Sequence, residues 1–212
     1  MSKLDKALDK LRENYGLALP DVKVAGAIDW LTLDSPDLNY VFGGGYPKGR
    51  IVTLQGPESG GKTALANYIG GQIQKQKDSP NVVAFVDMEH TFLEKYANVV
   101  GLDTSPDKFI FIRPKHGEEG FEIIRDLVET GEIGMFIWDS VASTPSAKAL
   151  GKEVGSATFG GTAAVMAEGL KVVNPLLSRY GVSTIFVNQV RAKIGGMPGF
   201  GPQENTKVLG LS

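Results

Sequence analysis

Cysteine is absent from this chain of 212 residues. Neither a disulfide nor a metal site built on thiolates is therefore possible, and the composition fits a reducing compartment, so we expect a cytoplasmic protein. Long hydrophobic runs are missing too, because no apolar segment approaches the roughly 18 residues that a membrane-spanning helix needs. The first residues are charged and amphipathic, unlike a secretory signal. These features predict a protein without membrane contact.

The chain also has little net charge, −2 at pH 7. Any contact with nucleic acid must then come from a local basic patch, because the surface as a whole is not basic. The hydrophobic share of 42% is ordinary for a globular protein and is enough for a full core in one main domain. Glycine is abundant, with 27 residues gathered mostly in a few clusters, which indicates phosphate-binding turns and loops rather than low complexity.

The N-terminal segment 2–15 places its apolar residues on one helical face and predicts a short amphipathic helix. These residues are Leu4, Leu8, Leu11 and Tyr15. The segment Gly16–Pro47 is rich in turn-forming residues and is interpreted as a connector docked on the core. We therefore divide the chain into an N-terminal helix and connector at 1–24 and a core at 25–212.

Short apolar runs alternate with helical patterns from Arg50 onward. The expected strands are Ile51–Gln55, Val82–Asp87, Phe109–Arg113, Met135–Asp139 and Thr184–Asn188. The expected helices are Lys62–Lys75, Phe92–Val100, Gly120–Glu129 and Thr162–Ser178. Pro175 is expected to kink the last helix or to end it early. This alternation predicts an α/β fold, a mainly parallel sheet with helices on both faces, in which ligands bind beyond the carboxyl ends of the strands.

A glycine-rich run connects the first of these strands to the first helix and matches the pattern G-x-x-x-x-G-K-[ST]. Its residues are Gly56, Pro57, Glu58, Ser59, Gly60, Gly61, Lys62 and Thr63. Glycines let successive backbone N–H groups turn toward a phosphate, and the helix behind them presents its positive end to the same charge. Lys62 is expected to reach the terminal phosphates and Thr63 to ligate Mg²⁺. The run predicts a nucleoside-triphosphate site.

Carboxylates end two further strands. Asp139 follows an apolar strand and is expected to complete the Mg²⁺ shell opposite Thr63, the alternative being a helix-capping role. Asp87 and Glu89 close another strand and, by strand alternation, are expected on the same side of the ligand edge. A carboxylate there can activate the water that attacks the terminal phosphate, the alternative being a solvated acid or a cap. His90 beside them fits a structural role better than a catalytic one.

An amide and a basic loop follow the last strand. Gln189 can hydrogen-bond a terminal phosphate and pass its movement to the segment beyond it, unless it is simply part of a polar turn. The loop adds cations and apolar side chains among glycines and prolines: Arg191, Lys193, Met197, Phe200 and Lys207. An earlier glycine-rich segment adds Lys152 and Phe159. Such loops suit single-stranded nucleic acid, where phosphates are neutralised and bases are stacked, although many such loops bind nothing.

In this order, the motifs resemble those of the bacterial and phage RecA recombinases. The matching stretches are 49–52, 56–63, 85–90, 138–142 and 186–195, and the resemblance covers about 25–204. It implies a RecA-like P-loop NTPase core that uses ATP and Mg²⁺. It also implies filaments of the protein on single-stranded DNA, which exchange strands with duplex DNA in homologous recombination, DNA repair and the SOS response to DNA damage.

The resemblance implies further roles. Glu89 matches the acid that activates the attacking water, Gln189 matches the sensor of the γ-phosphate, and Tyr96 matches an aromatic that stacks on adenine. Two segments, 151–161 and 195–206, look like mobile DNA-binding loops. The residues implied at the DNA are Lys152, Phe159, Arg191, Lys193, Ile194, Gly195, Met197 and Phe200.

The chain departs from the family pattern at three places. Leu93 stands where the family has an acid that touches the base, and Gly60 replaces a common serine. The chain also stops where family members continue with further strands and with lysines that reach a neighbour's ATP site. We therefore expect a recombinase truncated after its second loop, whose hydrolysis is inefficient without those lysines. A nucleotide-binding modulator or fragment of a full-length recombinase, and another RecA-like DNA motor ATPase, are the alternatives.

Overall fold

The computed structural model describes residues 28–151, 161–192 and 206–208, together with Lys6, Asp9, Lys10 and Glu13 near the N-terminus. These four residues are helical, and the rest of the predicted N-terminal helix lies outside the described residues. No helix within these ranges combines the length and apolar character that crossing a bilayer requires.

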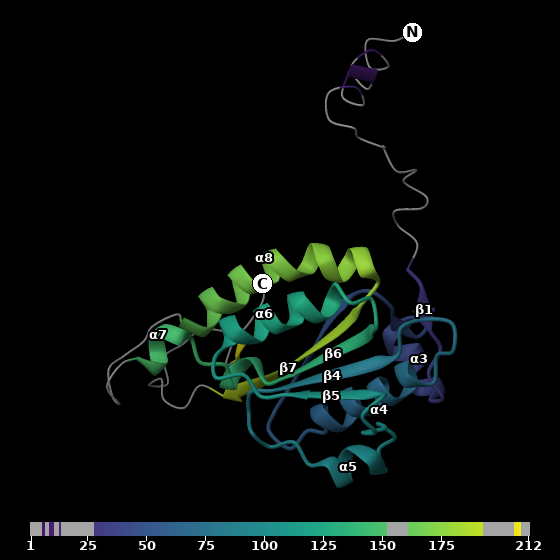
Figure 1. Cartoon of the computed structure of the whole chain (residues 1–212). Coiled ribbons are helices and arrows are strands. Elements are labelled where there is room, and N and C mark those ends of the chain that lie inside the picture. The colour runs from purple at the N-terminus through teal and green to yellow at the C-terminus, as the bar shows by residue number, and fades with distance from the viewer. Residues whose placement is uncertain are drawn as a thin grey trace, which may run out of the picture.

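A six-stranded sheet forms the centre of the molecule (Figure 1). Its strands are β3 (Ile51–Gly56), β4 (Val82–Asp87), β5 (Phe109–Ile112), β6 (Ile133–Asp139), β7 (Ser183–Ala192) and β8 (Thr206–Val208). The first five pair in parallel in the order β3-β7-β6-β4-β5, whereas β8 pairs antiparallel with the end of β7. The five predicted strands are confirmed, and β7 extends further than predicted.

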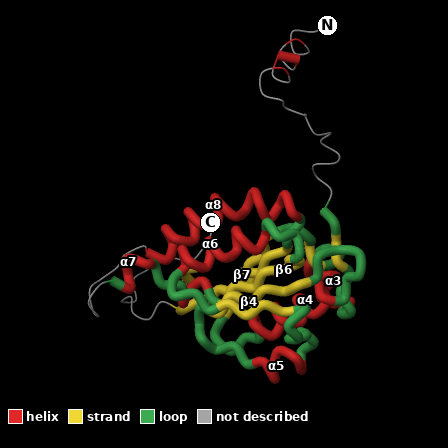
Figure 2. The backbone as a smooth tube through the Cα atoms, viewed as in Figure 1, coloured by secondary structure: helices red, strands yellow, loops and turns green. Residues whose placement is uncertain are grey.

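Helices cover both faces of this sheet (Figure 2). On one face α6 (Gly117–Val128) and α8 (Gly161–Tyr180) lie side by side. The other face carries α3 (Pro36–Phe42), α4 (Lys62–Gln74) and α5 (Glu94–Val99). A 3-10 turn (Val141–Ser143) and α7 (Ala147–Leu150) follow β6. The predicted α/β architecture is confirmed.

Separate apolar clusters pack the two faces, because side chains alternate along each strand. On β6, Phe136 and Trp138 belong to the cluster beneath α6 and α8, whereas Met135 and Ile137 belong to the cluster beneath α4. All four side chains are fully buried. The nearly continuous apolar runs of the sequence thus correspond to strands covered on both sides.

The segment before β3 contains an antiparallel pair, β1 (Trp30–Leu31) and β2 (Tyr46–Pro47), and one helix, α3, that was not predicted. Ser35 caps the start of α3 with its side chain, Pro36 occupies its first turn, and Gly43 ends it with φ 82°. The segment packs against the cluster beneath α4 through its buried side chains Leu31, Leu33 and Tyr46.

Pro175 was expected to kink α8 or to end it early. The helix runs through Pro175 to Tyr180, so the second of these alternatives is wrong. Proline lacks the N–H that would bond the carbonyl of Lys171. Both residues are exposed, so water can satisfy that carbonyl. Val173 and Leu177 are buried on either side of the proline, and their packing holds the helix together across the missing bond.

Candidate nucleotide-binding and catalytic site

A cavity of about 320 Å³ lies at the carboxyl ends of β3, β4, β6 and β7. Its lining residues are Glu58, Ser59, Gly60, Gly61, Lys62, Thr63, Ala64, Glu89, Thr91, Tyr96, Asp139, Val187 and Gln189. Most residues predicted for the nucleotide and for catalysis therefore meet in one place. Gly56 ends β3 and Pro57 follows it, so these two shape the loop without lining the cavity.

The loop between β3 and α4 has the backbone of an anion site. Ser59 and Gly61 have positive φ values of 57° and 78°, and α4 begins directly after Gly61, at Lys62. The first N–H groups of a helix lack partners within it, so they face the cavity as donors for an anion. The Lys62 ammonium donates to the Pro57 carbonyl at 2.6 Å, which folds this side chain back over the loop.

A hydrogen bond between Thr63 and Asp139 joins the start of α4 to the end of β6 at the cavity. The Thr63 hydroxyl donates to Oδ2 of Asp139 at 2.5 Å, although the two residues belong to α4 and β6. Asp139 is 2% exposed, and its Oδ1 atom is buried with no hydrogen-bond partner among the residues that the structure describes. Burial raises the pKa of Asp139 to about 6, the Thr63 hydrogen bond opposes this, and the charges of Glu89 and Asp87 add to it.

These two residues fit a magnesium ion. Mg²⁺ prefers hard oxygen ligands and is commonly held by one or two protein groups together with the phosphates of a substrate. A carboxylate with one buried oxygen that has no partner in the described part of the chain, next to a threonine hydroxyl, supplies such a ligand pair. A bound cation also removes the cost of burying the Asp139 charge.

Glu89 and Gln189 meet at the far side of the cavity. The Nε2 amide of Gln189, on β7, donates to Oε1 of Glu89 at 2.9 Å. The backbone N–H groups of Met88 and Glu89 both donate to the carbonyl of Asp139, at 2.7 and 3.1 Å. Hydrogen bonds thus connect the carboxyl ends of β4, β6 and β7 around the candidate catalytic acid.

Asp87 does not share the cavity with Glu89, which corrects the expectation from strand alternation. Strand β4 ends at Asp87, and the chain turns there, with His90 at a positive φ of 59°. Alternation therefore stops before Glu89. Asp87 is buried and forms an ion pair with Arg113 at 2.7 Å. His90 is exposed and does not line the cavity.

Helix α5 supplies the aromatic side of the cavity. Tyr96 lines it and is half-exposed, so its ring is accessible to a base. Leu93 is exposed at the start of α5 and does not line the cavity. Thr91 does line it and was not predicted, although its position two residues after Glu89 was a usable signal.

The predicted DNA-binding residues fall almost wholly outside the described part of the chain. Lys152, Phe159, Lys193, Ile194, Gly195, Met197 and Phe200 lie there. Arg191 is described as backbone only, in β7, where it pairs with Lys207 of β8. Strand β7 nevertheless runs directly from Gln189 in the cavity to Arg191.

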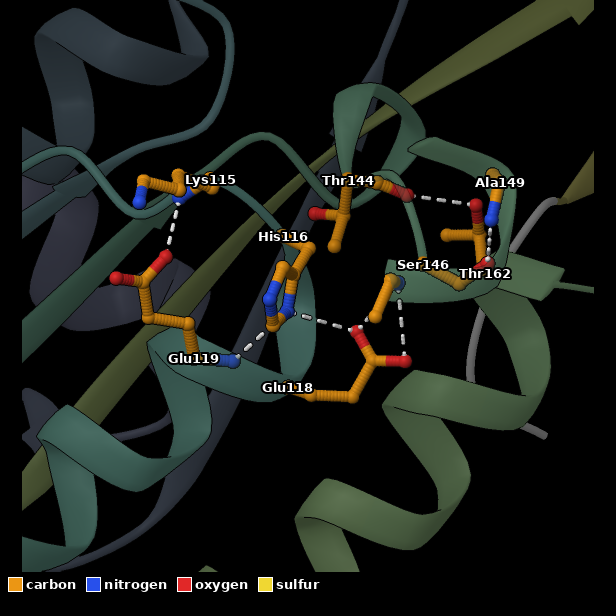
Figure 3. A network of polar contacts seen from close by, with 9 residues as sticks. Lys115, His116, Glu118, Glu119, Thr144, Ser146, Ala149 and Thr162 are labelled. Carbon is orange, nitrogen blue, oxygen red and sulfur yellow. Dashed lines mark hydrogen bonds and ion pairs between the residues drawn. The ribbon is translucent and has the colours of Figure 1, made fainter. Parts of the chain in front are cut away.

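Polar contacts hold residues on either side of the first candidate loop, 151–161 (Figure 3). The Thr162 hydroxyl donates to the Thr144 carbonyl at 2.7 Å, and the Trp138 indole donates to the Thr144 hydroxyl at 2.9 Å. Both carboxylate oxygens of Glu118 accept from the Ala147 N–H, at 3.2 and 3.0 Å. Glu118 also lies 3.2 Å from Nδ1 of His116. The residues that lead into this loop are thus held by the start of α6.

The fold and the site together define a class. A parallel sheet that delivers a glycine-rich loop to a helix N-terminus, with an acid on a central strand facing the loop's threonine, is the core of the P-loop nucleotide-binding proteins. The strand order and the helices on both faces are consistent with the RecA-like branch of that class.

Comparisons with known proteins agree. Residues 2–209 match the RecA N-terminal domain. The chain is 36% identical over 209 residues to protein RecA of Staphylococcus carnosus, covering 96% of this chain and 56% of that protein. It is 37% identical over 209 residues to protein RecA of Campylobacter lari, covering 96% and 58%. The chain belongs to the RecA family, and it spans a little over half the length of these relatives.

Proposed function

We propose that this chain binds ATP and Mg²⁺ in the cavity and hydrolyses the ATP, and that the state of the nucleotide controls its affinity for single-stranded DNA. One observation carries the proposal: inside the cavity, Gln189 is hydrogen-bonded to Glu89. Gln189 also lies two residues before Arg191 on the same strand, where the predicted DNA-binding segment begins. Strand β7 thus leads from the hydrogen-bond partner of the candidate catalytic acid to the candidate DNA loop.

The phosphate loop holds the triphosphate in this proposal. Backbone N–H groups at the start of α4 receive the phosphates, and Lys62 exchanges the Pro57 carbonyl for a phosphate oxygen. Thr63 and Asp139 hold Mg²⁺, which when bound neutralises phosphate charge. Tyr96 provides the surface on which adenine stacks.

Glu89 then acts on the water that attacks the γ-phosphate. Its carboxylate orients the water and accepts its proton. Gln189 donates an amide hydrogen either to Glu89 or to a γ-phosphate oxygen. The orientation of the Gln189 side chain therefore depends on whether the γ-phosphate is present. A change in that orientation can move β7, which continues to Arg191.

The larger role follows from the family. The RecA relatives support recombination and repair of DNA as the process. Within it, we propose that the chain self-associates into filaments on single-stranded DNA, which exchange strands with duplex DNA. We place this activity in the cytoplasm. The SOS response to DNA damage is a further role that such filaments serve.

ATP hydrolysis with and without single-stranded DNA tests the proposal. We expect DNA to stimulate hydrolysis, Glu89→Gln to reduce it by at least about 100-fold, and ATP affinity to change little in that variant. DNA binding should require an ATP analogue and weaken steeply with salt. Equal hydrolysis by the wild type and Glu89→Gln would exclude the assigned role of Glu89.

The same assays with added full-length RecA from Staphylococcus carnosus separate an autonomous ATPase from a subunit of a mixed assembly. The relatives are longer than this chain, so a full-length partner could supply residues that the chain lacks. If this chain contributes to ATP hydrolysis only in the mixture, and Glu89→Gln removes that contribution, the nucleotide site works as part of a mixed assembly. DNA binding that ignores both nucleotide and salt would contradict the recombinase proposal in either setting.

A further inference from the structure

Arg113 lies at the edge of the sheet, one residue beyond the end of β5. The last pair in the register of β4 and β5 is Val86 with Ile112, so Asp87 and Arg113 are the next neighbours across the two strands. Their Nη2 and Oδ2 atoms lie 2.7 Å apart. The Asp87 side chain is 1% exposed, whereas that of Arg113 is 47% exposed. A buried carboxylate is thus neutralised by a guanidinium that reaches in from the surface.

The second oxygen of Asp87 holds a turn. Its Oδ1 atom accepts from the Thr91 N–H at 3.2 Å, which closes the chain from 87 to 91 on itself. This turn carries Glu89 at its centre, and Thr91 at its end lines the cavity. Asp87 therefore ties the turn to the sheet edge with one oxygen and shapes it with the other.

Arg113 is itself held in place. Its guanidinium lies over the Phe111 ring, 5.1 Å from the ring centre, so the side chain has a platform on one side and a carboxylate at its tip. A planar fork fixed in this way sets the position of Asp87 more narrowly than a flexible ammonium does.

We propose that Arg113 is a positioning residue for ATP hydrolysis, which acts through Asp87 to hold the turn that presents Glu89 to the attacking water. The inference rests on the proposed function, because it assumes that Glu89 acts on that water. Arg113 is not among the residues that line the cavity, and neither are Asp87 and Phe111, which its guanidinium contacts. Its effect is therefore on the rate of the chemical step and not on ATP binding, since small displacements of a catalytic group slow a reaction strongly.

Arg113→Met removes the fork and keeps much of the apolar stem. We expect single-turnover hydrolysis with saturating DNA to slow by about 10- to 100-fold, while the Kd for a fluorescent ATP analogue stays within about twofold. Arg113→Lys keeps a charge without the fork and should recover part of the rate. Arg125→Met is the matched control: that arginine is 48% exposed and pairs with the neighbouring Asp126 on α6, so we expect no change.

A second measurement does not depend on activity. Hydrogen exchange followed by NMR should show the Thr91 amide losing protection by about 10-fold or more in Arg113→Met, with Phe85 in β4 unchanged. If Arg113→Met fails to fold because it leaves Asp87 buried and unpaired, the double variant Asp87→Asn with Arg113→Met removes that charge and is used in the same two assays.

The outcomes separate this inference from the proposed function. Wild-type rate and wild-type Thr91 protection in Arg113→Met would overturn the positioning role. Lost ATP affinity in that variant would overturn it as well, since binding is expected to persist. If instead Glu89→Gln hydrolyses ATP as the wild type does, the proposed function fails, and the exchange data alone then decide whether Arg113 controls the turn.

Discussion

Gln189 and Glu89 lie 100 positions apart in the sequence, yet the amide of the first donates to the carboxylate of the second at 2.9 Å. Gln189 belongs to β7, and Glu89 belongs to the turn after β4. These strands are not neighbours, because β6 lies between them in the sheet. The contact therefore bridges the central strand at the cavity, where movement of one side chain must alter the surroundings of the other.

Replacing Gln189 by Ala should uncouple nucleotide from DNA. The variant loses the amide that can reach either Glu89 or a phosphate, while the phosphate loop is untouched. We expect ATP affinity to stay within about threefold, and the increase in DNA affinity caused by an ATP analogue, typically about 5- to 150-fold for coupled sites, to fall toward one. Fluorescence anisotropy of a labelled oligonucleotide with and without analogue measures this. Coupling that survives in Gln189→Ala would assign the sensor to another residue.

The burial of Asp139 predicts how stability depends on pH in the absence of Mg²⁺. Its pKa rises from the ordinary 3.8 to about 6, so the folded state binds the proton more tightly than the unfolded state. Stability should therefore fall as pH rises from about 4 to about 6, and the full penalty remains above that range. Asp139→Asn should raise the free energy of unfolding at pH 7.5 by about 1–3 kcal/mol and change it little at pH 4.

Urea unfolding in EDTA at both pH values tests this, with Asp126→Asn as the control at an exposed position on α6. Equal effects of the two variants at pH 7.5 would contradict the burial argument. Mg²⁺ with ATP should stabilise the wild type more than Asp139→Asn, because the phosphate loop is intact in the variant but one of the two proposed Mg²⁺ ligands is lost.

The sheet and the phosphate loop could be predicted because they depend on local signals. Apolar runs such as that of β6 mark a strand covered on both faces, and the loop at 56–63 is contiguous in the sequence. Helix α3 was missed although Ser35, Pro36 and Gly43 are standard start and stop signals, because the surrounding segment is rich in turn-forming residues.

Contacts that depend on strand order could not be predicted. Asp87 pairs with Arg113 because β4 and β5 are adjacent, and only the assembled sheet specifies that adjacency. Strand alternation grouped Asp87 with Glu89, but alternation holds only while a strand lasts, and β4 ends at Asp87. The continuation of α8 through Pro175 likewise depends on how the opposite face of the helix is buried, and the sequence of the helix alone does not specify that packing.

Close packing of α6 against α8 predicts a large effect at one glycine. A Cβ added at Gly169 would overlap the ring of Phe121, which is buried on α6. Gly169→Ala should therefore lower the free energy of unfolding by about 1–3 kcal/mol despite the better helix propensity of alanine. Adding Phe121→Leu should recover part of the loss. Gly151→Ala is the control, because a Cβ there meets nothing within 4 Å.

Glu118 predicts an effect on DNA binding whose sign is informative. Its carboxylate holds the Ala147 N–H at the start of α7, just before the first candidate DNA loop. Glu118→Ala removes a negative charge, which by electrostatics alone should strengthen DNA binding. We expect the reverse, a loss of about 3- to 10-fold in affinity for single strands with unchanged ATP affinity, because the loop loses its anchor. Glu122→Ala makes the same charge change at an exposed position one turn further along α6 and should leave affinity equal or slightly higher. Anisotropy titrations at two salt concentrations distinguish the cases, and parallel behaviour of the two variants would exclude an anchoring role for Glu118.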